Sequence, residues 1–237
     1  DSPTALITAV HSSEAPADDR GSTLIFTPDQ FSFRMEKLVY EQFDRKQFLN
    51  IRVTTPARFS AELLKKHGMN RGYADDAVKY ALMYRTLAEL KAPGVRQLGF
   101  YGDKRLGAEL VNFSLGMVRT LKTAGLTPNE LKRLLNSEND FPETLSEKLS
   151  DLLLIYSSYD TALKQGFEDR LDDILRAERL VRETSALSGT KCFFVGFDDF
   201  SGNQLLLLKA VAETAACSSF FFVTDGAFSK KPQFACI

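Results

Sequence analysis

The run Ser22-Thr-Leu-Ile-Phe-Thr-Pro-Asp29 is the part of the sequence that indicates the fold. Its first six residues are apolar, β-branched or hydroxylated, and Pro28 stops them, which is the pattern of a short strand buried in a parallel sheet. Asp29 can then cap a helix, because apolar residues follow it at nearly helical spacing: Phe33, Leu38, Val39 and Phe43. The run therefore predicts a strand that leads directly into a helix.

The same pattern of a strand followed by a helix recurs along the chain. Residues 50–55, Asn-Ile-Arg-Val-Thr-Thr, predict a second strand, and Pro56 opens a helix that stops at Gly68. The last fifty residues predict a strand over 191–197, a helix over 203–215 and a strand over 218–224. Four strands that alternate with helices predict an α/β fold with a parallel sheet.

The middle of the chain carries helical patterns only. We expect helices over residues 77–90, 106–124, 128–135, 145–164 and 169–184, and a short one before the first strand at 2–13. The chain therefore divides into an α/β domain, built as one sheet from residues 1–70 and 187–237, and a large all-α insertion subdomain over residues 71–186.

Composition and charge leave several functions open. The 237 residues carry 30 Lys and Arg against 31 Asp and Glu, so DNA binding would need a local basic face. The cysteines are widely spaced and fit a reducing compartment: Cys192, Cys217 and Cys236. No apolar run of about 18 residues and no signal peptide occur, so we expect a cytoplasmic protein with no membrane partner. Ile237 follows apolar residues without a helix stop, and we expect the chain to continue in a longer parent.

Polar residues follow each predicted strand, where open parallel sheets bind their ligands. Asp198 and Asp199 are the most suggestive, because a carboxylate after a buried strand can hold a metal ion or orient a water against a phosphate. Helix capping explains such residues equally well. The phosphate loop G-x-x-x-x-G-K-[ST] is not in this sequence, and His11 and His67 have no ligand residue at metal-binding spacing. We therefore predict no catalytic and no metal-binding residues.

Basic side chains with aromatic residues among them suit single-stranded nucleic acid, because lysine and arginine bind phosphates and aromatic faces stack on bases. A solvated helix surface has the same composition, so this alternative stays open. The basic residues are Lys65, Lys66, Arg71, Arg96, Lys104, Arg105, Arg119, Lys122, Lys132 and Arg133, with Tyr73, Phe100 and Tyr101 between them.

Particular strings resemble the AddB/RexB-type subunits, the partners of UvrD-like helicases in bacterial complexes that process DNA breaks. Residues 27–37, Thr-Pro-Asp-Gln-Phe-Ser-Phe-Arg-Met-Glu-Lys, resemble the family segment VPEQFSFQMEK. Residues 53–60 are similar to VLSFSRLA, and residues 121–131 to LKRYGISPEEL. Residues 194–204, Phe-Val-Gly-Phe-Asp-Asp-Phe-Ser-Gly-Asn-Gln, stand where the family carries IDGFxxFTPQE and UvrD-like helicases carry VDEFQDTNxxQ.

The resemblance implies a parallel sheet of the P-loop NTPase (RecA-like) class. It implies a region without ATPase activity, because the Asp-Glu pair of an active helicase is matched by Val195-Gly196. The family's phosphate loop would precede Asp1, so ATP binding stays open. No cofactor is expected in this chain, whereas the resemblance implies magnesium and an iron-sulfur cluster in the parent.

The leading hypothesis is a DNA-binding and scaffolding region of a helicase-nuclease subunit that acts in double-strand break repair and recombination. Its partners would be single-stranded DNA and a UvrD-like motor subunit. An active superfamily 1 helicase core is the alternative, and a nucleotide-fold protein unrelated to DNA is a third. Nucleotide-binding residues are expected at Gln30, Asp198, Asp199 and Gln204, and DNA-binding residues at Thr54, Thr55, Arg58, Lys104 and Arg105, with Gln30 also facing the DNA.

Overall fold

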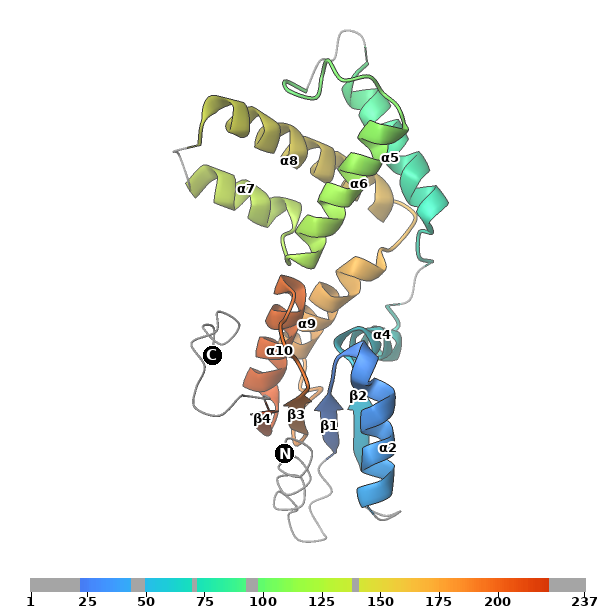
Figure 1. Ribbon diagram of the computed structural model, residues 1–237, viewed down its shortest axis with the longest axis vertical. Helices are drawn as coiled ribbons and strands as arrows, with labels where there is room; N and C mark the ends of the chain where they lie inside the picture. Colours follow the sequence, from blue (N-terminus) through green and yellow to red (C-terminus); the bar gives the residue numbers. More distant parts are fainter. Residues whose placement is uncertain (1–21, 44–49, 70–71, 93–97, 138–140, 222–237) are drawn as a thin grey trace. The chain divides into compact units, whose positions relative to one another are not determined.

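Four parallel strands form one sheet in the computed structural model, which describes residues 22–43, 50–69, 72–92, 98–137 and 141–221 (Figure 1). The strands are β1 (Thr23–Phe26), β2 (Ile51–Thr54), β3 (Lys191–Val195) and β4 (Cys217–Phe221), in the order β2-β1-β3-β4. Central β1 pairs with both β2 and β3, so that Phe26 stands beside Thr54 on one side and Phe194 on the other. The predicted α/β fold, in which the front and back of the chain share one parallel sheet, is confirmed.

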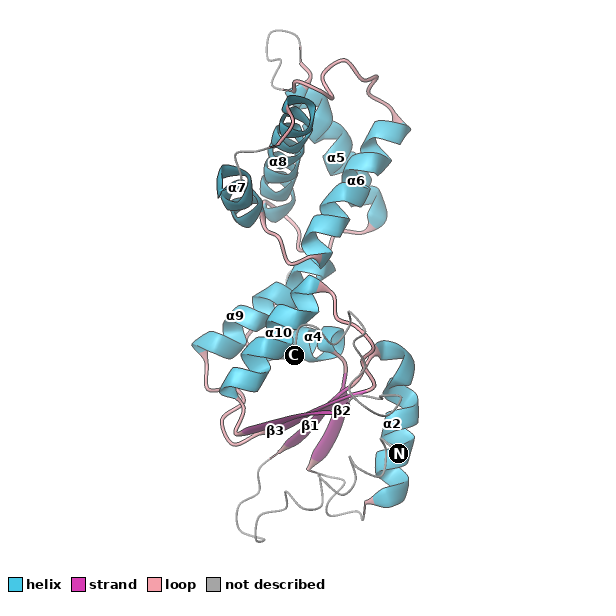
Figure 2. Ribbon diagram, turned by 60° about the vertical axis from the view of Figure 1, so that its left-hand side comes forward, coloured by secondary structure: helices cyan, strands magenta, loops and turns pink. Residues whose placement is uncertain are grey.

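Helices cover both faces of the sheet (Figure 2). Alternate strand residues point to opposite faces, and Leu24, Phe26, Cys192 and Phe194 belong to one core with helices α4 (Pro56–Lys66), α9 (Asp173–Glu183) and α10 (Gly202–Thr214). The other face carries Ile25, Val53, Phe193 and Val195, packed against Val39 and Phe43 at helix α2 (Ser32–Gln42). Strands that are apolar on both faces are buried on both faces, as their composition predicted.

The helix after β2 begins as predicted, whereas the helix after β1 does not. After β2, the Thr55 hydroxyl accepts a hydrogen bond from the backbone N–H of Arg58 at 3.2 Å, and Pro56 fills the first turn of α4. After β1, Asp29 lies within a short 3-10 turn, η1 (Asp29–Phe31), and its side chain makes no cap. The prediction that Asp29 caps the following helix is therefore wrong.

The strand ends also differ slightly from the predicted ones. β3 ends at Val195 rather than at residue 197, because Gly196 adopts a φ of 78° and turns the chain out of the sheet. β4 ends at Phe221, and the predicted residues 222–224 lie outside the described residues. The helix predicted at 2–13 also lies outside them.

The middle of the chain is helical, as predicted. It holds α5 (Asp76–Leu90), α6 (Ala108–Thr123), α7 (Pro128–Ser137), α8 (Glu143–Lys164) and the short turn η2 (Arg170–Asp172). Asp75 caps α5 by accepting a hydrogen bond from the backbone N–H of Val78 at 2.7 Å. At the start of α7, the side chains of Thr127 and Glu130 each accept a hydrogen bond from the other residue's backbone N–H.

The chain separates into a sheet unit, residues 1–68 with 174–237, and a helical unit, residues 69–173. The prediction placed residues 174–186 in the helical insertion, and this boundary needs correction. Ala177, Leu180 and Val181 of α9 are buried in the core of the sheet unit, so the apolar face of that helix assigns it there. Among the described helices, none combines the length and the apolar character that a membrane span requires.

The aromatic stack around Phe26 yields a test of the sheet core. Phe26 is fully buried, with ring centroids 5.2 Å from both Phe59 and Phe194. Phe26→Ala is expected to lower the free energy of unfolding by about 3–5 kcal/mol, because it removes the ring and leaves a cavity. Urea denaturation followed by circular dichroism measures this. The control Phe33→Ala, at a ring that is 77% exposed, should change stability by less than about 0.5 kcal/mol.

Candidate functional site

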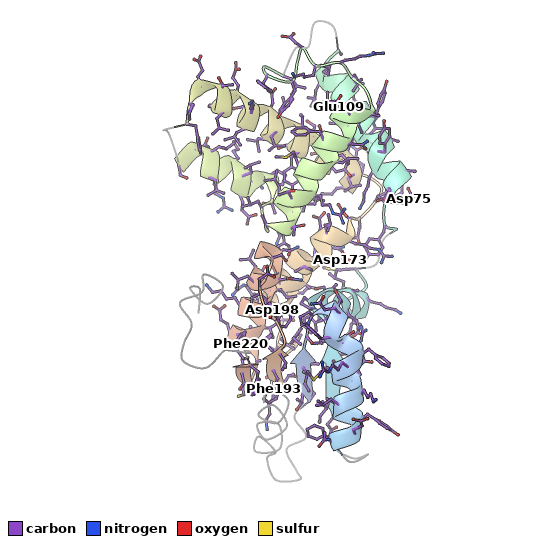
Figure 3. The ribbon with its side chains drawn as sticks, viewed as in Figure 1. Asp75, Glu109, Asp173, Phe193, Asp198 and Phe220 are labelled. Atoms are coloured by element: carbon purple, nitrogen blue, oxygen red, sulfur yellow. The ribbon has the colours of Figure 1, made fainter. Side chains whose placement is uncertain are left out.

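A pocket of about 390 Å³ opens at the carboxyl end of the sheet. Its walls come from the segments after β1, β2 and β3, and from the start of α10: Pro28, Asp29, Gln30, Pro56, Gly196, Phe197, Asp198, Asp199 and Gln204. Figure 3 shows Asp198 beyond the end of the strands, whereas Phe193 lies along them. The four residues predicted to bind a nucleotide thus line one pocket.

Local structure explains how these side chains reach the pocket. Pro28 stops β1, and η1 then carries Asp29 and Gln30 outward, where both are exposed. On β3 the turn at Gly196 places Asp198 and Asp199 at the surface, while Phe197 stays buried. The side-chain amide oxygen of Gln204 accepts a hydrogen bond from the backbone N–H of Ser201 at 3.1 Å. Gln204 therefore both caps α10 and lines the pocket.

The pocket is rich in hydrogen-bond acceptors. Asp29, Asp198 and Asp199 contribute carboxylates, and Gln30 and Gln204 contribute amides that can both accept and donate. The fully buried hydroxyl of Thr27, the residue before Pro28, has no hydrogen-bond partner in the described structure. Such an arrangement can accept hydrogen bonds from the N–H groups of a ligand, and it opposes a phosphate by charge repulsion.

Three predicted DNA-contact residues lie beside the pocket, at the junction of β2 and α4. Thr54 and Thr55 are 0% and 1% exposed, and the Thr55 hydroxyl is used as a helix cap. Their contact with DNA stays a prediction, and it would require this buried junction to open. Arg58 is exposed, and its guanidinium donates a hydrogen bond to Glu36 of α2 at 2.7 Å. The guanidinium therefore lies at the surface and forms an ion pair with Glu36.

The other two, Lys104 and Arg105, belong to the helical unit and are both exposed. They follow a loop whose backbone is held by the buried Asp151, which accepts hydrogen bonds from the N–H groups of Gly99 at 2.9 Å and Tyr101 at 2.8 Å. In that loop the ring of Phe100 lies below two ammonium groups, with Lys148 Nζ 4.4 Å and Lys104 Nζ 5.8 Å from its centroid.

Lys122 does not belong to the predicted basic surface. Its side chain is 1% exposed, and its ammonium group donates hydrogen bonds to Asp172 at 2.7 Å and Asp169 at 3.1 Å. The next acid along the chain, Asp173, is buried and accepts a hydrogen bond from the Tyr73 hydroxyl at 2.7 Å. Arg71 and Arg96 lie outside the described residues.

Lys122 and the carboxylates of Asp160, Asp169 and Asp172 form a group that we call the Lys122 cluster. Burial and charge shift the pKa values of its members in opposite directions. Burial disfavours the charged form of Lys122, but Asp172 and Asp169 outweigh it and raise the pKa of the lysine. Burial alone would raise the pKa of Asp169, yet Lys122 and the hydrogen bonds from Lys79 and Leu171 hold that pKa below its ordinary value. For Asp172 burial prevails and the pKa is raised, although Lys122 opposes the shift.

Neither of the two described thiols, Cys192 and Cys217, lines the pocket. Cys192 is buried on β3, and burial raises its pKa to about 12, so the thiol stays protonated at neutral pH. Cys217 is exposed on β4, and Cys236 lies outside the described residues.

Comparison with known proteins identifies the family. The sequence model described as ADDB, N-terminal, matches residues 4–234, which is nearly the whole chain. The chain belongs to the ADDB N-terminal family. The resemblance seen in the strings around Gln30 and Asp198 is thereby confirmed.

Relatives of this ADDB N-terminal chain are named as one of the subunits of an ATP-dependent helicase/deoxyribonuclease. The protein from Clostridium novyi is 24% identical over 222 residues, covering 88% of this chain and 18% of the relative. That from Clostridioides difficile is 21% identical over 230 residues, 94% of this chain and 19% of the relative. The protein from Geobacillus thermodenitrificans is 26% identical over 199 residues, which cover 81% of this chain and 17% of the relative. The chain therefore spans less than a fifth of the length of these relatives.

Sequence reasoning missed part of the pocket of this ADDB N-terminal chain. It did not single out Asp29 as a site residue, because the residue was assigned to helix capping, nor the walls formed by Pro28, Pro56 and Phe197. A signal existed: each of these residues lies within three positions of the end of a predicted strand. Which of them face a common pocket depends on the strand order, which local patterns do not reveal.

Gly196 provides a test of the turn that shapes the pocket. A side chain at its φ of 78° is strained, and an added Cβ would lie 3.6 Å from the Phe31 ring. Gly196→Ala is therefore expected to cost about 1–2 kcal/mol of stability, measured by chemical denaturation. Gly116→Ala serves as the control, because Gly116 lies within α6 with open space around its Cα. It should stabilise the helix by about 0.5–1 kcal/mol. Equal effects of the two changes would contradict the strained turn.

Proposed function

We propose that this chain is the helicase-like, DNA-binding and scaffolding region of a helicase-nuclease subunit, and that its pocket holds a base of single-stranded DNA. One observation carries the proposal: Gln30 after β1 lines one pocket with Asp198 and Gln204, which lie more than 160 residues further along the chain, at the carboxyl end of a parallel sheet. Open α/β sheets bind their ligands at this edge.

The chemistry of the pocket favours a base over a phosphate. Carboxylates of Asp29, Asp198 and Asp199 repel a phosphate group but accept hydrogen bonds from the N–H donors of guanine, cytosine or adenine. The amides of Gln30 and Gln204 can pair with either donors or acceptors on a base edge. A volume of about 390 Å³ lies within the usual range of small-ligand sites.

The sheet is proposed to be of the P-loop NTPase (RecA-like) class and to lack ATPase activity. Its order β2-β1-β3-β4, its parallel strands and its helices on both faces support the class. The end of β3 supports the lack of hydrolysis, because Val195-Gly196 stands where an active helicase carries Asp-Glu. The alternative, an active superfamily 1 helicase core, is favoured by one observation: Asp198 and Asp199 lie exposed just beyond β3, where they could orient a hydrated magnesium ion.

For the parent protein, we propose a role in double-strand break repair and homologous recombination in the cytoplasm. A UvrD-like motor subunit is the proposed partner, and the word subunit in the names of the relatives supports a partner chain. Magnesium and an iron-sulfur cluster would belong to the parts of the parent that account for the remaining length of the relatives.

Gln30→Ala tests the proposed base pocket. It should weaken binding to a single-stranded oligonucleotide about threefold to tenfold, because one hydrogen bond to a base is lost. Fluorescence anisotropy measures the affinity, with an oligonucleotide of the same length made of abasic sites for comparison. The wild-type chain should bind the abasic strand more weakly, and the variant should show a smaller difference between the two strands.

Gln42→Ala is the matched control, because Gln42 is an exposed glutamine at the end of α2 and outside the pocket. It should leave the affinity unchanged. Micromolar binding of magnesium-ATP that is lost in Asp198→Asn, with DNA-stimulated hydrolysis, would instead support the helicase alternative.

Lys104 and Arg105 of the helical unit are proposed as a separate contact, to the phosphates of single-stranded DNA. Both side chains are exposed after a loop whose conformation Asp151 and Lys91 hold by hydrogen bonds to its backbone. The Lys104 ammonium also lies over the Phe100 ring, which limits its conformational freedom. A restrained cation loses less entropy when it binds a phosphate.

The double variant Lys104→Glu with Arg105→Glu tests this contact. Removing two phosphate contacts should reduce the slope of log affinity against log salt by about 1.4, since each contact on a single strand contributes about 0.7. Anisotropy titrations at several salt concentrations measure the slope. The control Lys132→Glu with Arg133→Glu changes two neighbouring exposed residues of α7, in the same unit, and should reduce the slope less. Equal slopes for both variants would remove the specific role of Lys104 and Arg105.

A further inference from the structure

The helical unit has a hydrophobic core of its own. Its buried residues all lie between Ala74 and Leu163, and they come from the segments around α5, α6, α7 and α8. Figure 1 shows α5, α6 and α8 close together, and Tyr156 adds a polar tie by donating a hydrogen bond to the carbonyl of Leu126 at 3.0 Å. The core of the sheet unit draws on a separate set of residues.

The two ends of the helical unit are bonded to each other. Near the start of the unit, Gly72 accepts a hydrogen bond from the N–H of Glu168 at 3.0 Å, and the N–H of Ala74 donates to the carbonyl of Glu168 at 2.9 Å. Tyr73 adds a side-chain bond to Asp173 and lies 4.9 Å from the Arg170 guanidinium. Residues 72–74 at the start of the unit are thus bonded to residues 168–173 at its end, nearly a hundred positions further along the chain.

Behind this closure lies the buried ammonium group of Lys122, in the last turn of α6. It contacts carboxylates from α8 and from the closing segment: Asp160 at 3.9 Å, Asp169 at 3.1 Å and Asp172 at 2.7 Å. From α5, Lys79 donates to the second oxygen of Asp169 at 2.9 Å. Lys122 therefore joins α6 and α8 to the segment that leaves the unit, and Lys79 joins α5 to the same segment.

We propose that the helical unit is a self-closed module whose lock is the Lys122 cluster, and that the module opens as one unit while the sheet unit stays folded. Two observations carry the proposal: a separate core, and chain ends that are bonded within the same module. Cooperative units of this kind open and close on their own in native proteins. The device would let the helical unit rearrange without loss of the pocket at the sheet edge.

The Lys122 cluster holds the module closed because removal of Lys122 leaves buried carboxylates without their cation, which costs free energy. With Lys122 removed, Asp169 would remain buried with Lys79 as its other ion-pair partner among the described residues, and Asp172 would remain partly buried beside it. Loss of one partner from a buried ion pair is strongly destabilising, whereas replacement of all the charges by neutral groups is often tolerated. The cluster can therefore be tested by removal and by rescue.

Native-state hydrogen exchange of the whole 237-residue chain, read residue by residue, tests the proposal. Lys122→Met should lower the protection of amides in residues 72–173 by about a hundredfold or more. Amides of β1 and β3 should keep their protection. Adding Asp169→Asn and Asp172→Asn to Lys122→Met should raise the protection again by at least about tenfold, because the two carboxylates that accept hydrogen bonds from Lys122 are then neutral.

Lys164→Met is the matched control. Lys164 is 64% exposed on its side chain and also contacts Asp160, so its loss should change protection by less than about threefold. Should the helical unit unfold entirely in Lys122→Met while β1 and β3 stay protected, the independence of the module is supported. The proposal fails if strand amides lose protection in parallel with the helices, if Lys122→Met has no effect, or if the added Asn substitutions give no rescue.

Discussion

The rest of the structure depends on the parallel pairing of β1 with β3. Phe26 stands beside Phe194, although the two residues are 168 positions apart, and each strand is buried on both faces. Because the backbone groups of a buried strand must find partners, β1 needs β3 as much as it needs β2. This pairing turns two distant segments into one sheet and lets the chain between them form a separate helical unit.

The pairing also creates the candidate site. Parallel strands end at the same edge, so the residues after β1, β2 and β3 converge there although no local signal links them. The turn at Gly196 and the stop at Pro28 decide which side chains are exposed at that edge. A chain that spans less than a fifth of the length of its relatives thus contains a pocket built at the edge of one sheet.

Polar groups play opposite parts in the two units. In the pocket of the sheet unit, the acids Asp198 and Asp199 are exposed and lie beside hydrogen-bonding amides, an arrangement that suits a ligand. In the helical unit, Asp169 and Asp172 are bonded to Lys122 and serve the fold. Aspartates therefore differ in role between the two units because their burial and their partners differ.

Local chemistry in the sequence was sufficient to place most elements. Short apolar runs such as residues 22–27 and 50–55, each followed by a proline, predicted strands that lead into helices, because these preferences act over a few residues. The polar strand ends likewise indicated where a site could lie. The family followed from long strings rather than from any such pattern.

Only the tertiary structure decided the roles that depend on burial. Lys122 reads as a surface cation in the sequence, yet it lies 1% exposed among three carboxylates contributed by α8 and by the segment around η2. Helix α9 reads as part of the helical insertion, yet Ala177 and Val181 bury it against the sheet. In both cases the environment comes from residues far along the chain, and the periodicity of a single helix shows which face is apolar without showing what covers it.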